Sequence, residues 1–186
     1  MPTPQKMLAV PYESQHDNES GEGYRECFTS TCGAIARFWG RVSGDDAYAR
    51  IRANYGDTTN PAAQERALRH LGLQCRFITN GTPEIIRAEI DAGRPVAVGW
   101  IHKGALPDAL WGSGHWSAVI GYTGSHAIHH DPYGEADILR GGYVNLKGGA
   151  GVAYSWRNWR QRWEVMPVGR GYRHLPGNGW ALLISP

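Results

Sequence analysis

The clearest hydrophobic pattern in the chain begins near the N-terminus, directly after a polar loop. Apolar residues recur there at i, i+4, i+7 and i+11: Phe28, Cys32, Ile35 and Trp39. This spacing places them on one stripe of a helix, which is the side that a helix buries. Gly40 follows at once, and glycine is common just beyond a helix end. The pattern predicts a helix from about Phe28 to Trp39.

Four further helices are predicted from their start signals and their apolar spacing. One follows Ser43 and has two aspartates in its first turn, where acidic side chains complement the helix dipole. Another begins at Asn60-Pro61, with an N-cap residue before a proline at the first helical position. A third begins at Thr82-Pro83, and a last helix covers about Tyr154 to Val165.

Strands are predicted by alternation and by continuous apolar runs. Leu73, Cys75 and Phe77 alternate with polar residues, which indicates a half-buried strand with Cys75 in the core. Other strands are expected at Leu8–Tyr12, Pro95–Ile101, His115–Tyr122, His126–His130 and Trp180–Ile184. A Thr-Gly-Ser turn joins His115–Tyr122 to His126–His130, so these two predict an antiparallel hairpin.

The order of these elements favours an α+β fold, because helices come first and a mostly antiparallel sheet follows. The stretch 102–114 has no clear pattern and is rich in glycine, and long loops of this kind are often functional. The length of 186 residues is most simply explained by one domain that covers residues 1–186.

Composition narrows the class of protein. The chain is 41% hydrophobic and 19% charged, its net charge is only +2, and no apolar run approaches the ~20 residues of a membrane span. A nucleic-acid partner is therefore not expected, and neither is a transmembrane segment. Pro11 interrupts the N-terminal apolar run, which argues against a signal peptide and for synthesis in the cytoplasm. Three scattered cysteines do not suggest a disulfide framework. We expect a monomer without a cofactor or metal.

Two cysteines near the first helix are candidate nucleophiles. Cys32 belongs to the buried stripe, so we expect it to be a small core residue. Cys27 lies at the mouth of the polar loop and at the helix N-terminus. Unpaired backbone N–H groups and the helix dipole favour a thiolate there. The pattern therefore selects Cys27 as the reactive thiol.

A cysteine nucleophile needs a base, and the base needs a group that orients it. The second half of the chain offers several histidines: His102, His115, His126, His129, His130 and His174. His115 begins a predicted strand after a glycine-rich loop, and the partner strand ends beside it at His130 or Asp131. Cys27, His115 and Asp131 can thus supply a nucleophile, a base and an orienting group. Gln15 can add a side-chain N–H to an oxyanion hole.

Several motifs in order resemble the papain-like cysteine peptidases of the bacteriocin-processing, or double-glycine, type. The shared features are a Gln before a Cys-led helix that ends in Phe-Trp-Gly, a Gly-His strand that ends in Gly-Tyr, and a later Asp-Pro. In this chain they are Gln15, Cys27, Phe38-Trp39-Gly40, Gly114-His115, Gly121-Tyr122 and Asp131-Pro132. The resemblance extends from Val10 to about Trp163 and is greatest to the branch of bacteriophage endolysins and cell-wall enzymes.

The resemblance implies a papain-like fold and a peptidase in which Cys27, His115, Asp131 and Gln15 are catalytic. It also implies that the substrate is the peptide part of bacterial peptidoglycan, which an endolysin-like enzyme reaches after release from the cell that makes it. Leader-peptide processing is expected less, because such domains are usually fused to a transporter. The chain departs from the family pattern in the inserted segment NESGEGYRE before Cys27, which leaves the role of Gln15 less secure.

Three other functions remain open on the residues alone. The histidines near Asp131 invite a zinc amidase, although alternation places His126 and His130 on one strand face and His129 on the other. Carboxylates such as Glu26 or Asp131 suggest a glycosidase. A non-catalytic wall-binding module is the third.

The C-terminal helix adds a possible surface contact. Trp156, Trp159 and Trp163 recur at helical spacing, which is most simply a buried stripe. The arginines between them are Arg157, Arg160 and Arg162. On the other faces of the helix they are candidates for contact with anionic wall polymer or lipid head groups.

Overall fold

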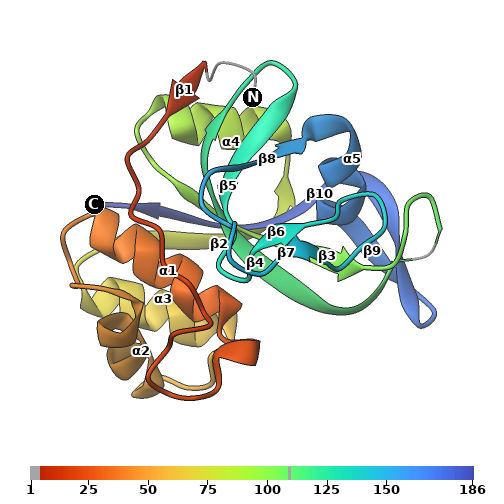
Figure 1. Ribbon diagram of the computed structural model, residues 1–186. Coiled ribbons are helices and arrows are strands. Elements are labelled where there is room, and N and C mark those ends of the chain that lie inside the picture. The colour runs from red at the N-terminus through yellow and green to blue at the C-terminus, as the bar shows by residue number, and fades with distance from the viewer. Residues whose placement is uncertain (1–4, 109) are drawn as a thin grey trace.

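The chain forms a central antiparallel sheet with helices on both faces (Figure 1). The computed structural model describes residues 5–108 and 110–186, so residues 1–4 and 109 of the expected domain lie outside the described residues. The helices are α1 (Cys27–Phe38), α2 (Asp45–Ala53), α3 (Pro61–His70), α4 (Pro83–Asp91) and α5 (Trp156–Trp163), with a short 3-10 helix η1 (Gly23–Arg25) before α1.

The strands make one large sheet and one small one. They are β1 (Lys6–Met7), β2 (Gln74–Gly81), β3 (Val96–Lys103), β4 (Trp111–Tyr122), β5 (His126–His130), β6 (Glu135–Ala136), β7 (Tyr143–Asn145), β8 (Val152–Ser155), β9 (Glu164–Val168) and β10 (Gly171–Ser185). The large sheet runs β2-β10-β3-β4-β5-β8, with β1 on β4 and β9 on β10, and every pairing in it is antiparallel. The predicted α+β class is confirmed.

Two hydrophobic cores lie on opposite faces of this sheet. The first packs α1, α2 and α3 against one face and contains the predicted stripe of α1, with Cys32 and Ile35 fully buried. The second packs α4 and α5 against the other face, around Trp100, Trp159 and Trp163. Phe28, the second residue of α1, stacks on Trp116 of β4, so the N-terminus of α1 lies beside that strand.

The predicted helix boundaries agree with the capping found in the structure. Asn60 Oδ1 accepts a hydrogen bond from the N–H of Ala62 at 2.9 Å, and Thr82 caps α4 through the N–H of Ile85 at 3.4 Å. At the end of α1 the chain turns at Gly40 with φ of 67°, a left-handed conformation that glycine adopts without a Cβ clash.

Several strand boundaries differ from the prediction. The expected strand Leu8–Tyr12 is wrong, because the strand that pairs with β4 is Lys6–Met7 and the chain leaves β4 after a last hydrogen bond from Leu8 N–H to Ile120 O. Pro11 has no N–H for a ladder there, and Val10 O instead accepts a hydrogen bond from His130. Strand β4 begins at Trp111 rather than His115, since Trp111 pairs with Lys103 beyond a bulge. The loop before it is correspondingly shorter than expected.

Candidate active site

Cys27 is the first residue of α1, so it occupies the helix N-terminus where the backbone N–H groups have no partner within the helix. Its side chain is partly exposed, whereas Cys32 is fully buried. Burial raises the pKa of the Cys32 thiol well above its ordinary value, which keeps that thiol protonated and unreactive. The expectation that Cys32 is a core residue is confirmed.

Cys75 is less buried than its strand pattern suggested. It is half-buried, and its thiol donates to Glu65 O at 3.4 Å. Burial raises the pKa of this thiol to about 11. Neither Cys32 nor Cys75 lines the cleft that contains Cys27.

The structure brings His115 and Asp131 into direct contact. Strands β4 and β5 pair so that Ala118 faces His130, which places Asp131 close to His115 at the end of the hairpin. The His115 Nε2–H donates to Asp131 Oδ1 at 2.7 Å. His115 is 3% exposed and Asp131 is 0% exposed, so this pair is shielded from solvent.

The electrostatic balance at His115 favours the imidazolium. Burial by itself lowers the pKa of His115, but the Asp131 carboxylate raises it both as a nearby charge and as a hydrogen-bond acceptor. Cys27 raises the pKa of His115 further, and the net value is about 10. Because Nε2 is bonded to Asp131, the nitrogen left for proton exchange with the thiol is Nδ1.

The carboxylate of Asp131 is itself held by groups that the sequence did not indicate. The Tyr154 hydroxyl donates to Asp131 Oδ2 at 3.0 Å, and the N–H of Tyr133 donates to Oδ1 at 3.1 Å. Tyr154 was expected in the last helix, but it lies in β8, the strand that pairs with β5. Its hydroxyl also accepts a hydrogen bond from the N–H of Ala136 at 2.9 Å. Asp131 thus points at His115 in a fixed orientation.

Gln15 lies in the same cleft but is already engaged. It is 1% exposed, and its Nε2 donates to Gly23 O in the inserted segment. The backbone N–H of Gln15 donates to Pro132 O at 3.0 Å, which ties it to the residue after Asp131. Since an amide nitrogen carries two hydrogens, one N–H of Gln15 is left for another acceptor.

The inserted segment is folded around a buried carboxylate. Glu26, directly before Cys27, is 3% exposed and accepts hydrogen bonds from Asn18 Nδ2 at 2.8 Å and Ser20 Oγ at 2.7 Å. Arg52 of α2 lies 3.7 Å from the same carboxylate. These contacts fix the loop against the N-terminus of α1. The Glu26 carboxylate is thus engaged by these hydrogen bonds, and Glu26 does not line the cleft, as a glycosidase carboxylate would need to.

Around Cys27 and His115 lies a cleft of about 890 Å³ with largely aromatic walls. Phe28 and Trp116 are stacked on one wall, with their ring centroids 3.6 Å apart. Tyr133 and Tyr143 form another wall, next to His102. Burial lowers the pKa of His102 to about 3, with a further contribution from the positive charge of His115, so His102 is neutral.

The histidines considered as zinc ligands each form a hydrogen bond with a different protein group. His129 is buried and pairs with Ser117 Oγ at 2.9 Å, and His126 pairs with Ser125 Oγ at 2.8 Å. His130 donates from Nε2 to Val10 O at 2.8 Å. Within residues 5–108 and 110–186, no group of three or more His, Cys, Asp or Glu side chains is arranged to hold a metal ion.

The C-terminal helix is mostly buried. Trp156, Trp159 and Trp163 pack into the second core, so the buried stripe that their spacing predicted is confirmed. Arg162 corrects the surface interpretation, because it is 0% exposed and donates to three backbone oxygens: Ile138 O, Ile101 O and Gly104 O. Arg160 pairs with Glu164 at 2.9 Å, so Arg157 is the exposed arginine of this helix. A contact with wall polymer or lipid stays a prediction for these two. In the part of the chain that the structure describes, no helix is long and apolar enough to cross a bilayer.

Comparisons with known proteins identify the family and the fold. The model of the Peptidase_C39 like family matches residues 7–164. No curated protein matches the chain significantly. Among solved structures, a protein described as a C39-like peptidase from Bacillus anthracis is similar, with a TM-score of 0.64 and 14% identity over 98% of both chains.

Two transporter peptidases have the same fold. A double glycine motif protease from the AMS/PCAT transporter, solved in complex with the leader peptide, has a TM-score of 0.58 and 15% identity, covering 98% of this chain and 95% of its own. The peptidase domain of Streptococcus ComA has a TM-score of 0.54 and 16% identity, covering 88% of this chain and 93% of its own. At these identities the likeness is one of fold.

Proposed function

This chain belongs to the C39-like family of cysteine peptidases, and we propose that it hydrolyses amide bonds in the peptide part of bacterial peptidoglycan. The observation that carries the proposal is the meeting of Cys27, at a helix N-terminus, with the His115–Asp131 pair in one cleft. The volume and aromatic walls of that cleft support a branched peptide as the substrate, as does the similarity of the motifs to cell-wall enzymes.

In the first half of the reaction the Cys27 sulfur attacks the amide carbonyl. Cys27 and His115 act as a thiolate–imidazolium pair, because Asp131 holds the proton on the ring and the helix N-terminus stabilises the negative sulfur. The tetrahedral intermediate then collapses, the C–N bond breaks, and His115 gives its proton to the leaving amine.

In the second half a water molecule attacks the thioester. His115, now neutral, accepts a proton from that water, and the thiolate of Cys27 leaves as the acid product forms. Asp131 remains hydrogen-bonded to Nε2 throughout and fixes the ring so that Nδ1 faces the sulfur.

The oxyanion is stabilised by the backbone N–H of Cys27 and by the free N–H of Gln15. Cys27 is the first residue of α1, so its N–H is one of the helix donors without an intrahelical partner. Gln15 keeps its position through Gly23 O and Pro132 O, which means that the donor is in place before the substrate arrives.

The test is a digest of purified peptidoglycan followed by mass spectrometry. New free amines without new reducing ends are expected, since an amide bond is cut and no glycosidic bond is. New reducing ends would instead identify a glycosidase. A soluble peptide with a Gly-Gly bond, the kind of motif named for one structural neighbour, is compared as a competing substrate.

Two further outcomes distinguish the remaining alternatives. Loss of activity with a chelator but not with iodoacetamide would indicate a zinc amidase rather than a cysteine peptidase. Sedimentation with cell walls and no released fragment would indicate a wall-binding module. We also propose an endolysin-like role, in which the enzyme reaches the wall after release from the producing cell, and this role is tested by adding the protein to intact bacteria.

A further inference from the structure

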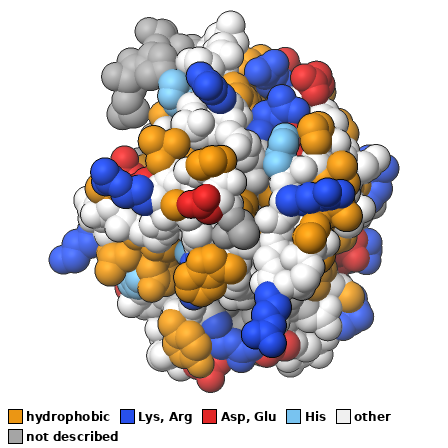
Figure 2. All heavy atoms as spheres, turned by 90° about the vertical axis from the view of Figure 1, so that its right-hand side faces the viewer, with side chains coloured by type: hydrophobic (Ala, Val, Ile, Leu, Met, Phe, Trp, Pro, Cys, Tyr) orange, Lys and Arg blue, Asp and Glu red, His pale blue; other side chains and the backbone are white. Residues whose placement is uncertain are grey.

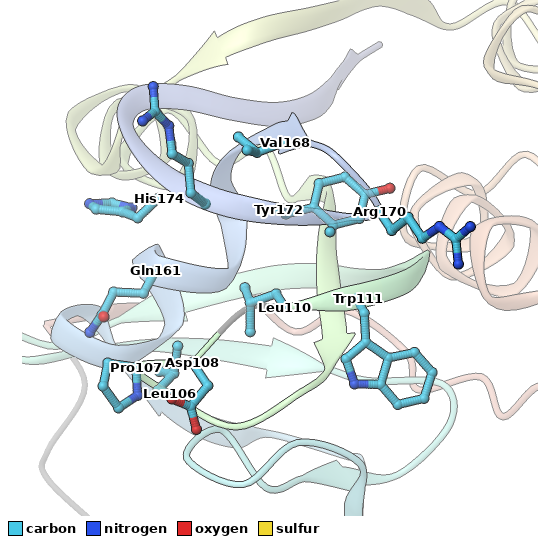
Figure 3. Close-up of a pocket in the computed structure, with 12 residues that line it drawn as sticks. Leu106, Pro107, Asp108, Leu110, Trp111, Gln161, Val168, Arg170, Tyr172 and His174 are labelled. Carbon is cyan, nitrogen blue, oxygen red and sulfur yellow. The ribbon is translucent and has the colours of Figure 1, made fainter.

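A second cavity, of about 550 Å³, lies outside the catalytic cleft (Figure 3). It is bounded by the loop that joins β3 to β4, by the β9–β10 hairpin and by Gln161 of α5. Its volume lies within the roughly 300–1,000 Å³ of typical small-ligand sites. We call it the Trp111 groove and define it by six of its lining residues: Leu106, Leu110, Trp111, Arg170, Tyr172 and Arg173.

The groove presents an aromatic ring together with positive charge. Trp111 is 55% exposed and Val168, which lines the same groove, is 48% exposed, so the groove presents neighbouring apolar side chains to solvent. Arg170 lies beside Trp111 at one end of the groove, while Leu106 and Asp108 lie at the other (Figure 3). Around the groove, this face of the molecule mixes hydrophobic side chains with Lys and Arg (Figure 2).

The groove adjoins the catalytic cleft. Lys103 lines the cleft, and its ammonium group lies 5.3 Å from the centre of the Trp111 ring, which lines the groove. Ser113 and Gly114, further along β4, line the cleft as well. A polymer bound at Cys27 can therefore continue over Lys103 onto Trp111.

The walls of the groove are held in place before any ligand binds. The N–H of Tyr172 donates to Leu110 O at 2.9 Å, which joins the hairpin to the loop. Arg162 donates to Gly104 O at 2.7 Å and fixes the base of the same loop. Such preorganisation lowers the cost of binding. Because these backbone groups are already paired, a peptide has little opportunity to bind there as an added strand.

We propose that the Trp111 groove binds the glycan strand of peptidoglycan. A sugar ring packs its C–H face on the exposed indole of Trp111, and the acetamido and lactyl carbonyl oxygens along the strand accept hydrogen bonds from the guanidinium groups of Arg170 and Arg173. The inference rests on the proposed function, because it assigns a second subsite to the same polymer. It places the glycan beside the cleft while the attached peptide enters the cleft toward Cys27.

The binding test uses the catalytically silent Cys27→Ala protein and two probes: purified peptidoglycan, and glycan strands freed of their stem peptides. In that background Trp111→Ala and the double variant Arg170→Ala/Arg173→Ala are each expected to weaken sedimentation with both probes about tenfold, a loss typical of one stacking or charge contact. Arg41→Ala removes an exposed arginine between α1 and α2, outside the groove and the cleft, and is expected to bind like the parent. Unchanged binding of the groove variants would overturn the proposal.

A kinetic test separates the groove from the chemistry. With Cys27 intact, Trp111→Ala is expected to raise KM for intact wall about tenfold and to leave kcat/KM for a soluble stem peptide unchanged. Equal losses on both substrates would overturn the groove, as would stem peptides that displace the protein from walls while glycan strands do not.

The two proposals fail in different ways. If the parent protein binds glycan strands through Trp111 but releases no amines, the proposed reaction is wrong and the groove stands. If Trp111→Ala digests walls with an unchanged KM, the groove is wrong and the reaction stands.

Discussion

The ionisation of His115 offers the sharpest test of the electrostatics of the site. Replacing Asp131 with Asn removes the charge that opposes burial but keeps a side chain of the same shape, whose oxygen still accepts from His115 Nε2. Burial is then opposed by Cys27 alone, and the pKa of His115 is expected to fall well below about 10. The difference between the folded-state pKa of about 10 and the ordinary value of 6.5 corresponds to at most about 5 kcal/mol of stabilisation of the His115 imidazolium.

Two assays follow this change. With Cys27 intact, the alkaline limb of the kcat/KM profile is expected near pH 10, because the reactive pair needs the imidazolium, and Asp131→Asn is expected to shift this limb to clearly lower pH. Tyr154→Phe serves as a control, since it removes a hydrogen bond to Asp131 without removing the charge. Its alkaline limb is expected to shift much less.

Stability gives an independent reading in the Cys27→Ala background, where no reactive thiol titrates. Asp131 raises the pKa of His115 in the folded state, so its stabilising contribution is complete below about pH 6.5 and is lost as pH rises through the folded-state pKa, which lies below about 10 once the contribution of Cys27 is removed. The free energy of unfolding is expected to decline over that window, and Asp131→Asn is expected to abolish the decline. An alkaline limb and a stability profile that Asp131→Asn leaves unchanged would refute the reasoning.

Three further substitutions, the last with Arg157→Ala as its control, test separate parts of the structure. Gln15→Ala is expected to lower kcat about 10²- to 10³-fold with little change in KM, and an equal loss carried by KM alone would contradict an oxyanion role. Tyr143→Phe is expected to leave the free energy of unfolding in urea unchanged or to raise it by up to about 1 kcal/mol. The reason is that the Tyr143 hydroxyl is buried and has no partner among the described residues. Arg162→Leu is expected to destabilise the protein by about 3 kcal/mol or more, since three backbone carbonyls lose their donor, whereas Arg157→Ala is expected to stay within about 0.5 kcal/mol.

Local signals were sufficient for much of the fold. The stripe from Phe28 to Trp39 predicted α1, and Asn60 and Thr82 predicted where α3 and α4 begin, because capping depends on residues close in sequence. Tyr154 shows the limit of this approach. The sequence placed it in the helix that follows, but it lies in β8 because this segment pairs with β5. Its hydrogen bond to Asp131 joins two residues that no local sequence pattern connects.

The sequence predicted those residues of the candidate site that lie at the start of a helix or in a strand with a clear pattern. Cys27 begins a helix and His115 lies in a predicted hairpin, whereas the choice between His130 and Asp131 needed the register of β4 and β5. In the structure Asp131 contacts His115, and His130 donates to Val10 O. Their catalytic roles stay predictions. The prediction that Arg162 is exposed was wrong. An arginine on an amphipathic helix is normally exposed, and only the tertiary fold places three backbone carbonyls around this one.

The most direct test of the nucleophile compares two cysteine variants in one peptidoglycan digest. Cys27→Ala is expected to release no new amines, while Cys32→Ala is expected to retain most of the activity, because Cys32 is buried in the core and its raised pKa keeps it a thiol. Amine release by Cys27→Ala together with an inactive but folded Cys32→Ala would contradict the assignment of Cys27.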